Sequence, residues 1–327
     1  SPPVVYYPPL SYNINPMGGL RRFLTFFIPA IILVSLTSSS AAQSVDREFI
    51  GDPGKWVSGP FLAYYHSAKD PQALFGSPIT IGFSDPATGQ RADKPLVASK
   101  DFDVHPQFLV GRGKLLGVRH TLDGEVTQWF DDEAKALQAT IDALLPATAN
   151  RLSMPQRGSS PYVLVQAYSD VQPEVMLVYH TGTRKLTRLG STHPGIDPKQ
   201  MGLTDFVRYK AADGLDIPAY ITLPPGQVMD GKPKNLPLVV LVHGGPWVRG
   251  AHWHWQAEVQ FLASRGYAVL QPEFRGSTGF GGQHFRAGFK QWGQAMQRDL
   301  ADGARWAVAQ GIAGPQRMAI AGASYGG

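Results

Sequence analysis

A serine with small neighbours lies near the end of the sequence. Ser324 occupies the centre of Gly-Ala-Ser-Tyr-Gly, residues 322–326, which directly follows the strand-like run RMAIA. A serine on a sharp turn after a buried strand is exposed for attack on a carbonyl carbon, and glycines beside it let the chain bend there without collision. The pattern Gly-x-Ser-x-Gly in this context predicts Ser324 as the nucleophile of an acyl-transfer reaction.

A glycine turn follows another apolar run. The segment LPLVVLVHGGPW, residues 236–247, reads as a buried strand that ends in two glycines. Backbone N–H groups freed by such a turn can stabilise an oxyanion. In hydrolases of this kind one donor comes from this region and another from the residue after the nucleophile, so we expect the N–H groups of Gly245 and Tyr325 to fill these roles. In α/β-hydrolases the catalytic base follows the serine in the sequence. His243 precedes Ser324 and is not assigned as the base.

Strand and helix patterns alternate in the part of the chain that carries these turns. Continuous apolar runs are typical of strands buried on both faces of a parallel sheet. Their alternation with helices predicts an α/β sheet with right-handed crossovers. The expected elements are a hairpin around Gly214, strands at 236–242, 267–274 and 317–322, and helices at 252–266 and 294–311.

The preceding part of the chain, residues 43–195, reads mostly as short strands joined by turn residues. Hairpins are expected around Gly124 and Gly182, because glycine accepts positive φ in tight turns. One segment, residues 131–146, begins with acidic residues, places apolar residues on one face and stops at a proline, which predicts an amphipathic helix. Turn-forming residues at 190–202 indicate a domain boundary there.

Three segments of the second half occur in a characteristic order: HGGP at 243–246, RGSTGFG at 275–281 and GASYGG at 322–327. Over residues 205–327 the sequence resembles the prolyl oligopeptidase family of serine peptidases, most closely its acylaminoacyl-peptidase and dipeptidyl-peptidase-like branch. The resemblance implies that residues 196–327 are the N-terminal part of an α/β-hydrolase domain. It also implies a β-propeller ahead of that domain, and residues 43–195 have room for about three or four blades of ~40–45 residues each.

The resemblance also bears on activity. In this fold the catalytic residues follow in the order Ser, Asp, His, and members of the family carry the last two after the nucleophile. The sequence ends at Gly327, so we expect a truncated chain that lacks the Asp and the His and is inactive alone. For the full-length protein the expected reaction is hydrolysis of short peptides by a serine peptidase, without a cofactor or a metal.

Two other functions remain open at this stage. A carboxylesterase uses the same serine turn and a similar glycine turn, but esterases generally lack an upstream β-domain. A non-catalytic binding fragment, in which the β-domain is the working part, would be unaffected by the substitution Ser324→Ala. The upstream β-domain favours the peptidase, because a propeller restricts access to small peptides.

The N-terminal region predicts export. Residues 17–42 contain two arginines, an apolar stretch and then small residues, which is the layout of a secretory signal peptide cleaved after Ala42. The apolar stretch Phe23–Leu36 is shorter than the ~20 residues that span a bilayer, so no membrane span is expected in the mature chain. Residues 1–16 precede Met17 and are an extension of uncertain origin. We expect a secreted or periplasmic protein.

Composition excludes several other classes. The net charge of +5 is spread along the chain without a basic run, which does not favour nucleic-acid binding. The absence of cysteine removes disulfides, thiolate metal sites and a cysteine nucleophile. His252 and His254 are expected at a helix start packed on the sheet rather than in a metal site, and Asp299 and Asp302 on a solvated helix face or in a salt bridge. The oligomeric state is not predicted.

Overall fold

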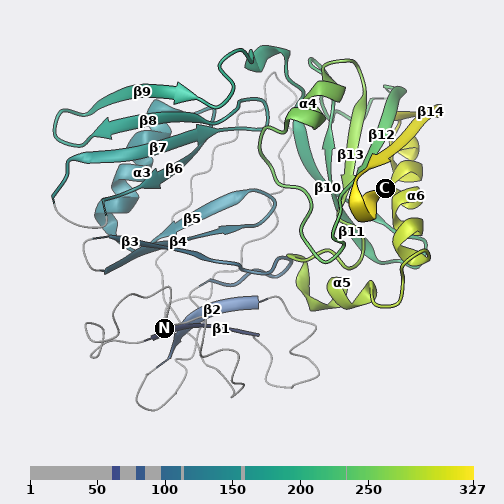
Figure 1. Cartoon of the computed structure of the whole chain (residues 1–327), viewed down its shortest axis with the longest axis horizontal. Helices are drawn as coiled ribbons and strands as arrows, with labels where there is room; N and C mark the ends of the chain where they lie inside the picture. Colours follow the sequence, from purple (N-terminus) through teal and green to yellow (C-terminus); the bar gives the residue numbers. More distant parts are fainter. Residues whose placement is uncertain (1–60, 67–78, 85–96, 112–113, 156–158, 233) are drawn as a thin grey trace.

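The computed structural model describes residues 61–66, 79–84, 97–111, 114–155, 159–232 and 234–327. For residues 61–66 and 79–84 only the backbone is described. The expected extension at 1–16 and the expected signal peptide at 17–42 lie outside the described residues. Figure 1 shows a set of β-sheets followed along the chain by an α/β region.

The upstream strands form three antiparallel sheets in chain order. The first contains β1 (Phe61–His66) and β2 (Ile79–Ser84), and the second contains β3 (Gln107–Gly111), β4 (Lys114–Thr121) and β5 (Glu125–Trp129). The third contains β6 (Ala149–Ser153), β7 (Tyr162–Tyr168), β8 (Val175–His180) and β9 (Lys185–Ser191). Strands joined in sequence order by short turns are typical of propeller blades. The expected hairpins around Gly124 and Gly182 are confirmed.

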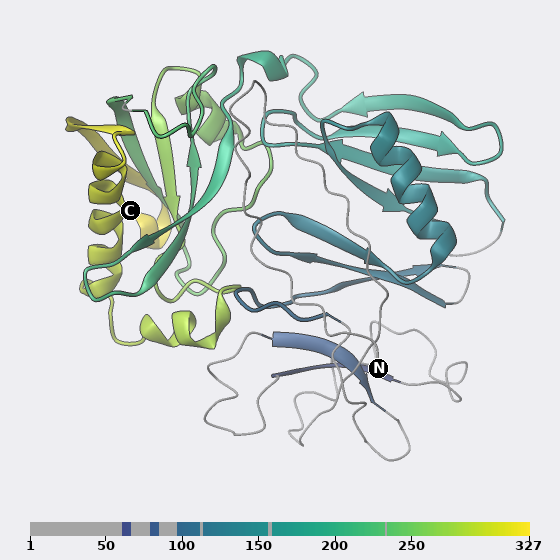
Figure 2. The same cartoon turned by 180° about the vertical axis from the view of Figure 1, so that it is seen from behind.

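The expected upstream helix is also confirmed. Helix α3 (Asp132–Leu144) connects β5 to β6, and the side chain of Asp131 caps it by accepting a hydrogen bond from the N–H of Ala134. Aspartate is favoured at this position because it satisfies an N–H group that has no partner within the helix. Ile141 is fully buried and joins the core of the third sheet. The helix therefore covers this sheet, as the view from behind in Figure 2 shows.

The α/β region is built on one five-stranded sheet in the order β10-β11-β13-β12-β14. Strand β12 runs parallel to both β13 and β14, whereas β10 and β11 form an antiparallel hairpin that joins β13. Helix α6 packs against β10, β12, β13 and β14. The strands are β10 (Thr204–Lys210), β11 (Asp216–Thr222), β12 (Leu236–Val242), β13 (Ala268–Pro272) and β14 (Ala313–Gly322), and the helices are α4 (Ala257–Ala263), α5 (Gly281–Ala287) and α6 (Ala295–Ala309).

One detail differs from the expectation. Helix α4 begins only at Ala257, so His252 and His254 precede it. The indole of Trp253, between these histidines, lies 6.3 Å from the ring of Tyr168 at the end of β7, so this segment faces the upstream sheets. Of the two alternatives expected for Asp299 and Asp302, the salt bridge is confirmed: Asp299 pairs with Arg275 and Asp302 with Arg305. Asp299 is fully buried and does not lie on a solvated face.

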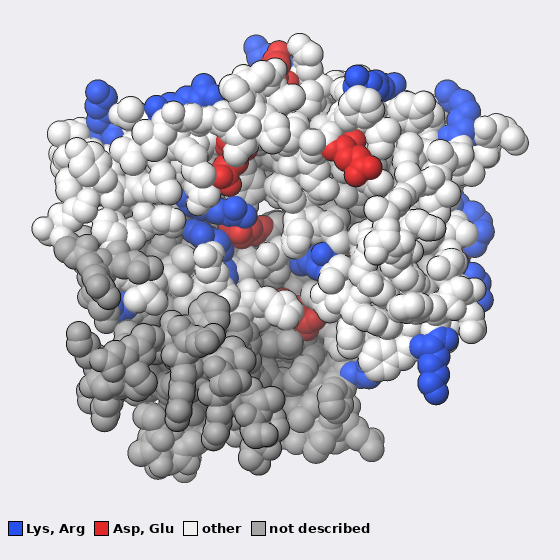
Figure 3. Space-filling model, in the orientation of Figure 1, with Lys and Arg blue, Asp and Glu red and all other residues white. Residues whose placement is uncertain are grey.

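The surface between the upstream sheets and the α/β region is charged. Figure 3 shows basic and acidic side chains together near the middle of this face, where it is hollowed. Within the described ranges no helix has the length and apolar character needed to cross a membrane. The core of the α/β region is apolar in contrast, with Leu238, Val240 and Leu270 buried in the centre of the sheet.

A buried histidine in β4 makes the stability of the protein depend on pH. His120 is 2% exposed, and neither ring nitrogen has a hydrogen-bond partner among the described residues. Burial lowers the pKa of His120 to about 4 from its usual 6.5. Below pH 6.5 His120 binds a proton in the unfolded chain but stays neutral in the folded chain. The free energy of unfolding therefore decreases as the pH falls from about 6.5 toward about 4.

We expect His120→Leu to weaken this pH dependence. Between pH 7 and pH 4 the free energy of unfolding of the wild type should fall by about 3 kcal/mol more than that of the variant, because each pKa unit corresponds to about 1.4 kcal/mol. Urea denaturation at several pH values measures the difference. The exposed His105 provides a control variant, His105→Leu. Parallel pH curves for the wild type and His120→Leu would contradict the assignment.

Candidate active site

The backbone turns sharply at Ser324. Strand β14 ends at Gly322, and residues Ser324–Gly326 form a single 3-10 turn directly after it. Ser324 has a φ of 57°, in the left-handed region that residues other than glycine seldom adopt. Such conformations persist where the surrounding structure enforces them, and they cluster at functional sites. The backbone bend expected of a nucleophile turn is therefore present at Ser324.

Two glycines make this bend possible. A Cβ on Gly326 would lie 2.2 Å from the carbonyl oxygen of Val242, and a Cβ on Gly322 would lie 2.2 Å from the carbonyl oxygen of Gly326. Both obstacles are backbone atoms, which cannot rotate away as the end of a side chain can. The turn consequently lies directly against the end of β12.

The glycine turn after β12 lies beside the serine. Val242 pairs with Gly322, so the two parallel strands end at the same edge of the sheet. A Cβ built on Gly244 would be 3.6 Å from Ser324 Oγ, and Gly245 has a φ of +116°, a conformation suited to glycine. The structure thus brings the segment of Gly245 next to Ser324 and Tyr325. The oxyanion roles of the N–H groups of Gly245 and Tyr325 stay a prediction.

The side chain of His243 contacts groups other than Ser324. Its Nε2 lies 3.0 Å from Ser277 Oγ and its Nδ1 lies 2.7 Å from the carbonyl oxygen of Gly244. The ring stacks on Phe274 at a centroid distance of 4.4 Å. Across the part of the chain that the structure describes, no histidine is hydrogen-bonded to Ser324 Oγ. The described residues also contain no group of three or more His, Asp or Glu side chains that could hold a metal ion.

A buried acid that sequence reasoning missed lies behind the glycine turn. Glu273 is fully buried, and its carboxylate accepts hydrogen bonds from the N–H groups of Gly250 and Ala251, with N–O distances of 3.0 and 2.6 Å to Oε1. Its Oε2 lies 3.5 Å from His243 Nε2. Burial raises the pKa of Glu273, and electrostatic interactions with His243 and Arg249 oppose that rise.

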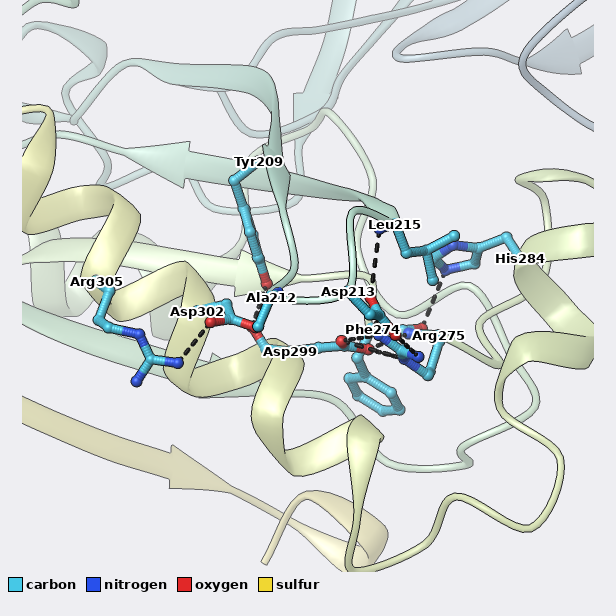
Figure 4. A network of polar contacts seen from close by, with 10 residues as sticks. All are labelled: Tyr209, Ala212, Asp213, Leu215, Phe274, Arg275, His284, Asp299, Asp302 and Arg305. Carbon is cyan, nitrogen blue, oxygen red and sulfur yellow. Dashed lines mark hydrogen bonds and ion pairs between the residues drawn. The ribbon is translucent and has the colours of Figure 1, made fainter.

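Arg275, in the segment RGSTGFG, links three elements (Figure 4). Its guanidinium donates hydrogen bonds to both carboxylate oxygens of the fully buried Asp299 on α6 and to Asp213 in the β10–β11 turn. The hydroxyl of Tyr209 on β10 donates to the backbone carbonyl of Asp299. Burial raises the pKa of Asp299, whereas hydrogen bonds from Arg275 lower the pKa of Asp213 to about 2. The network fixes the segment after β13 to both neighbours.

Arg249 connects the glycine-turn loop to the upstream sheets. Its guanidinium donates to the carbonyl oxygen of Leu122, in the turn between β4 and β5, and to the hydroxyl of Tyr220, which lies 2.7 Å away. It also lies 4.8 Å from the ring centroid of Phe280. The Tyr220 hydroxyl in turn donates to the carbonyl oxygen of Asp123. The loop after Gly245 is therefore held by groups from both regions.

We expect Gly326→Ala to destabilise the α/β region strongly. The added Cβ must displace the backbone of Val242, and overpacking of this kind costs about 1–3 kcal/mol. The matched control is Gly190→Ala in β9, because a Cβ at Gly190 meets no atom within 4 Å. Urea denaturation followed by tryptophan fluorescence compares the two. Equal transition midpoints for the two variants would show that the turn does not press on β12.

Removal of the two partners of Arg275 should have unequal effects. Asp299→Ala leaves a guanidinium that is 8% exposed without its buried counter-charge, which costs about 3–5 kcal/mol of stability. The side chain of Asp213 is 54% exposed, so solvent screens its ion pair and Asp213→Ala should cost under about 1 kcal/mol. Thermal and urea denaturation measure both losses. A larger loss for Asp213→Ala would contradict this ranking.

Comparison with known proteins adds independent information. Residues 253–327 match the model of the prolyl oligopeptidase family. The chain is 37% identical over 196 residues to dipeptidyl aminopeptidase BIII of Pseudoxanthomonas mexicana, which covers 59% of this chain and 28% of that protein. It is 36% identical over 181 residues to dipeptidyl peptidase family member 6 of Caenorhabditis elegans, covering 50% and 24%. The chain thus spans under a third of the length of these relatives.

Solved structures support the fold. A puromycin-hydrolyzing peptidase of Mycobacterium tuberculosis aligns with a TM-score of 0.54 at 24% identity, over 78% of this chain and 39% of that one. A prolyl endopeptidase structure aligns with a TM-score of 0.55 at 18% identity, over 82% and 39%. These likenesses bear on the fold alone. The resemblance seen in the three sequence segments is confirmed: residues 253–327 match the prolyl oligopeptidase family model, and the relatives named above are dipeptidyl peptidases by name.

Proposed function

We propose that the protein to which this sequence belongs is a serine peptidase that hydrolyses short peptides, with Ser324 as its nucleophile. The observation that carries the proposal is the left-handed φ of Ser324 at the end of β14, beside the glycine turn of Gly245 and within the segment that matches the family model. The names of the two relatives support release of dipeptides as the specific activity. This support favours a peptidase over a carboxylesterase.

The proposed reaction has two steps. Ser324 Oγ attacks the peptide carbonyl carbon and loses its proton to a base, and the N–H groups of Gly245 and Tyr325 donate to the oxyanion. The amine leaves with that proton, and water then releases the acyl group from the serine. The base is not His243, whose ring nitrogens face Ser277 and Gly244. We propose a histidine, oriented by an aspartate, from a part of the protein beyond the residues described.

The proposal includes the architecture of the whole protein. Residues 196–327 are proposed as the N-terminal part of an α/β-hydrolase domain and residues 43–195 as part of a β-propeller. The support is the five-stranded sheet that begins at Thr204 and the antiparallel sheets that precede it. Export through a signal peptide at 17–42 is likewise a proposal, based on the order of basic, apolar and small residues there.

The first test is to sequence the coding region downstream of the codon for Gly327 and to express the protein that it encodes. We expect an Asp and then a His in the added segment, and hydrolysis of chromogenic dipeptide amides with a free amino group. Ser324→Ala should lower turnover by a factor on the order of 10⁴ to 10⁶, as removal of a catalytic-triad member does.

Two controls accompany this test. Ser264→Ala, at an exposed serine after α4, should leave turnover unchanged. The 327-residue chain alone should show little or no hydrolysis, because its described residues place no base on Ser324 Oγ. A stop codon directly after Gly327, or hydrolysis that survives Ser324→Ala, would overturn the proposal.

A further inference from the structure

A fully buried acid lies under the loop that carries Gly245. Glu273 directly follows β13 and is fully buried. Its carboxylate bonds to backbone N–H groups, with Oε1 accepting from both Gly250 and Ala251 and Oε2 lying 3.1 Å from the nitrogen of Gly250. A buried carboxylate is costly unless it is compensated. Its retention under this loop therefore calls for a role that an apolar side chain would not fill.

The loop is packed tightly between its two ends. At its start, the loop follows His243, the first residue after β12. At its end, a Cβ on Gly250 would lie 2.0 Å from the ring of His243, so the chain returns and crosses that imidazole. Glu273 contacts both sides of this crossing, through the N–H of Gly250 and through Oε2, which is 3.5 Å from His243 Nε2.

The middle of the loop has few backbone hydrogen bonds of its own. Among the described residues, one backbone bond involves residues 246–248, from the N–H of Thr278 to the carbonyl oxygen of Val248 at 3.3 Å. Backbone bonds within the loop therefore add little to the position of Gly245, which depends on the fixed ends of the loop together with the side-chain contacts of Trp247 and Arg249. Bonds from N–H groups to a carboxylate are stronger than those to neutral acceptors, which suits this anchoring.

We propose that Glu273 is a positioning residue for the loop 244–251: by holding the N–H groups of Gly250 and Ala251, it fixes the N–H of Gly245 beside Ser324. The contacts of Glu273 are with Gly250, Ala251 and His243 rather than with Ser324, and it acts only through the loop. The use of Gly245 as an oxyanion donor rests on the proposed function, whereas the anchoring of the loop does not.

The test is amide hydrogen exchange, followed by NMR on the 327-residue chain at neutral pH. Glu273→Leu removes both acceptor oxygens at similar volume, and Glu273→Gln keeps one acceptor oxygen. We expect exchange at Gly250 and Ala251 to be about 10- to 100-fold faster in Glu273→Leu, because hydrogen bonds to charged groups contribute about 1.5–3 kcal/mol each. Glu273→Gln should restore part of the protection.

The informative signal comes from Gly245, which Glu273 does not contact. Its amide resonance should shift in Glu273→Leu and return toward the wild-type position in Glu273→Gln. The matched control is Gln271→Leu, because Gln271 is a buried polar residue of the preceding strand β13 whose side chain bonds Gln256 rather than the loop. This control should leave the Gly245 signal in place.

Three outcomes would overturn the proposal. An amide resonance of Gly245 that stays in place in Glu273→Leu would show that the carboxylate does not set the position of Gly245. Unchanged exchange at Gly250 and Ala251 in Glu273→Leu would show that the carboxylate does not hold the loop. Equal acceleration throughout β12 and β13 would show loss of the core rather than release of the loop. Neither measurement needs catalysis, so failure of the peptidase assay would contradict the proposed function and leave the anchoring result standing.

Discussion

The parallel pairing of β12 with β14 is the interaction on which the candidate site depends. Residues far apart in the sequence, Val242 and Gly322, are neighbours in this register, and both strands end at the same edge of the sheet. The site depends on that edge, because the glycine turn after β12 and the serine turn after β14 begin there side by side. Side chains larger than hydrogen at Gly322 or Gly326 would force the two turns apart.

Behind this edge the protein uses buried charges as rigid supports. Arg275 and Asp299 join the segment after β13 to α6, and Glu273 joins the same segment to the loop after β12. Such groups are expensive to bury, and their hydrogen bonds fix direction as well as distance. Well-packed apolar side chains can supply comparable stability, but they provide no directional hydrogen bonds to the loops. The supports and the turns thus form one unit centred on the end of β13.

Much of the fold could be predicted from the sequence, and the missed parts share one physical cause. Local signals revealed the hairpins, α3 and the serine turn, because turn residues and apolar periodicity act over a few positions. The partners of Glu273 were not predictable in this way, since they are backbone groups 22 and 23 residues distant. For Asp299 the sequence left a salt bridge and a solvated face open for the same reason, because its partner Arg275 is 24 residues away. One sequence signal could have pointed to these buried contacts. An acid, Glu273, and a base, Arg275, stand on either side of Phe274 directly after the apolar strand β13.

The left-handed backbone at Ser324 also limits which nucleophiles this scaffold could ever have adopted. Threonine carries the same hydroxyl group, but its branched Cβ is strongly disfavoured at a φ of 57°. The extra methyl group would also have to share the space beside Gly244, whose absent side chain already leaves only a narrow gap to the serine. Replacement of serine by threonine, which is conservative at most surface positions, is therefore disfavoured at this bend. The shape of the main chain, rather than the chemistry of the hydroxyl group, dictates the choice of serine.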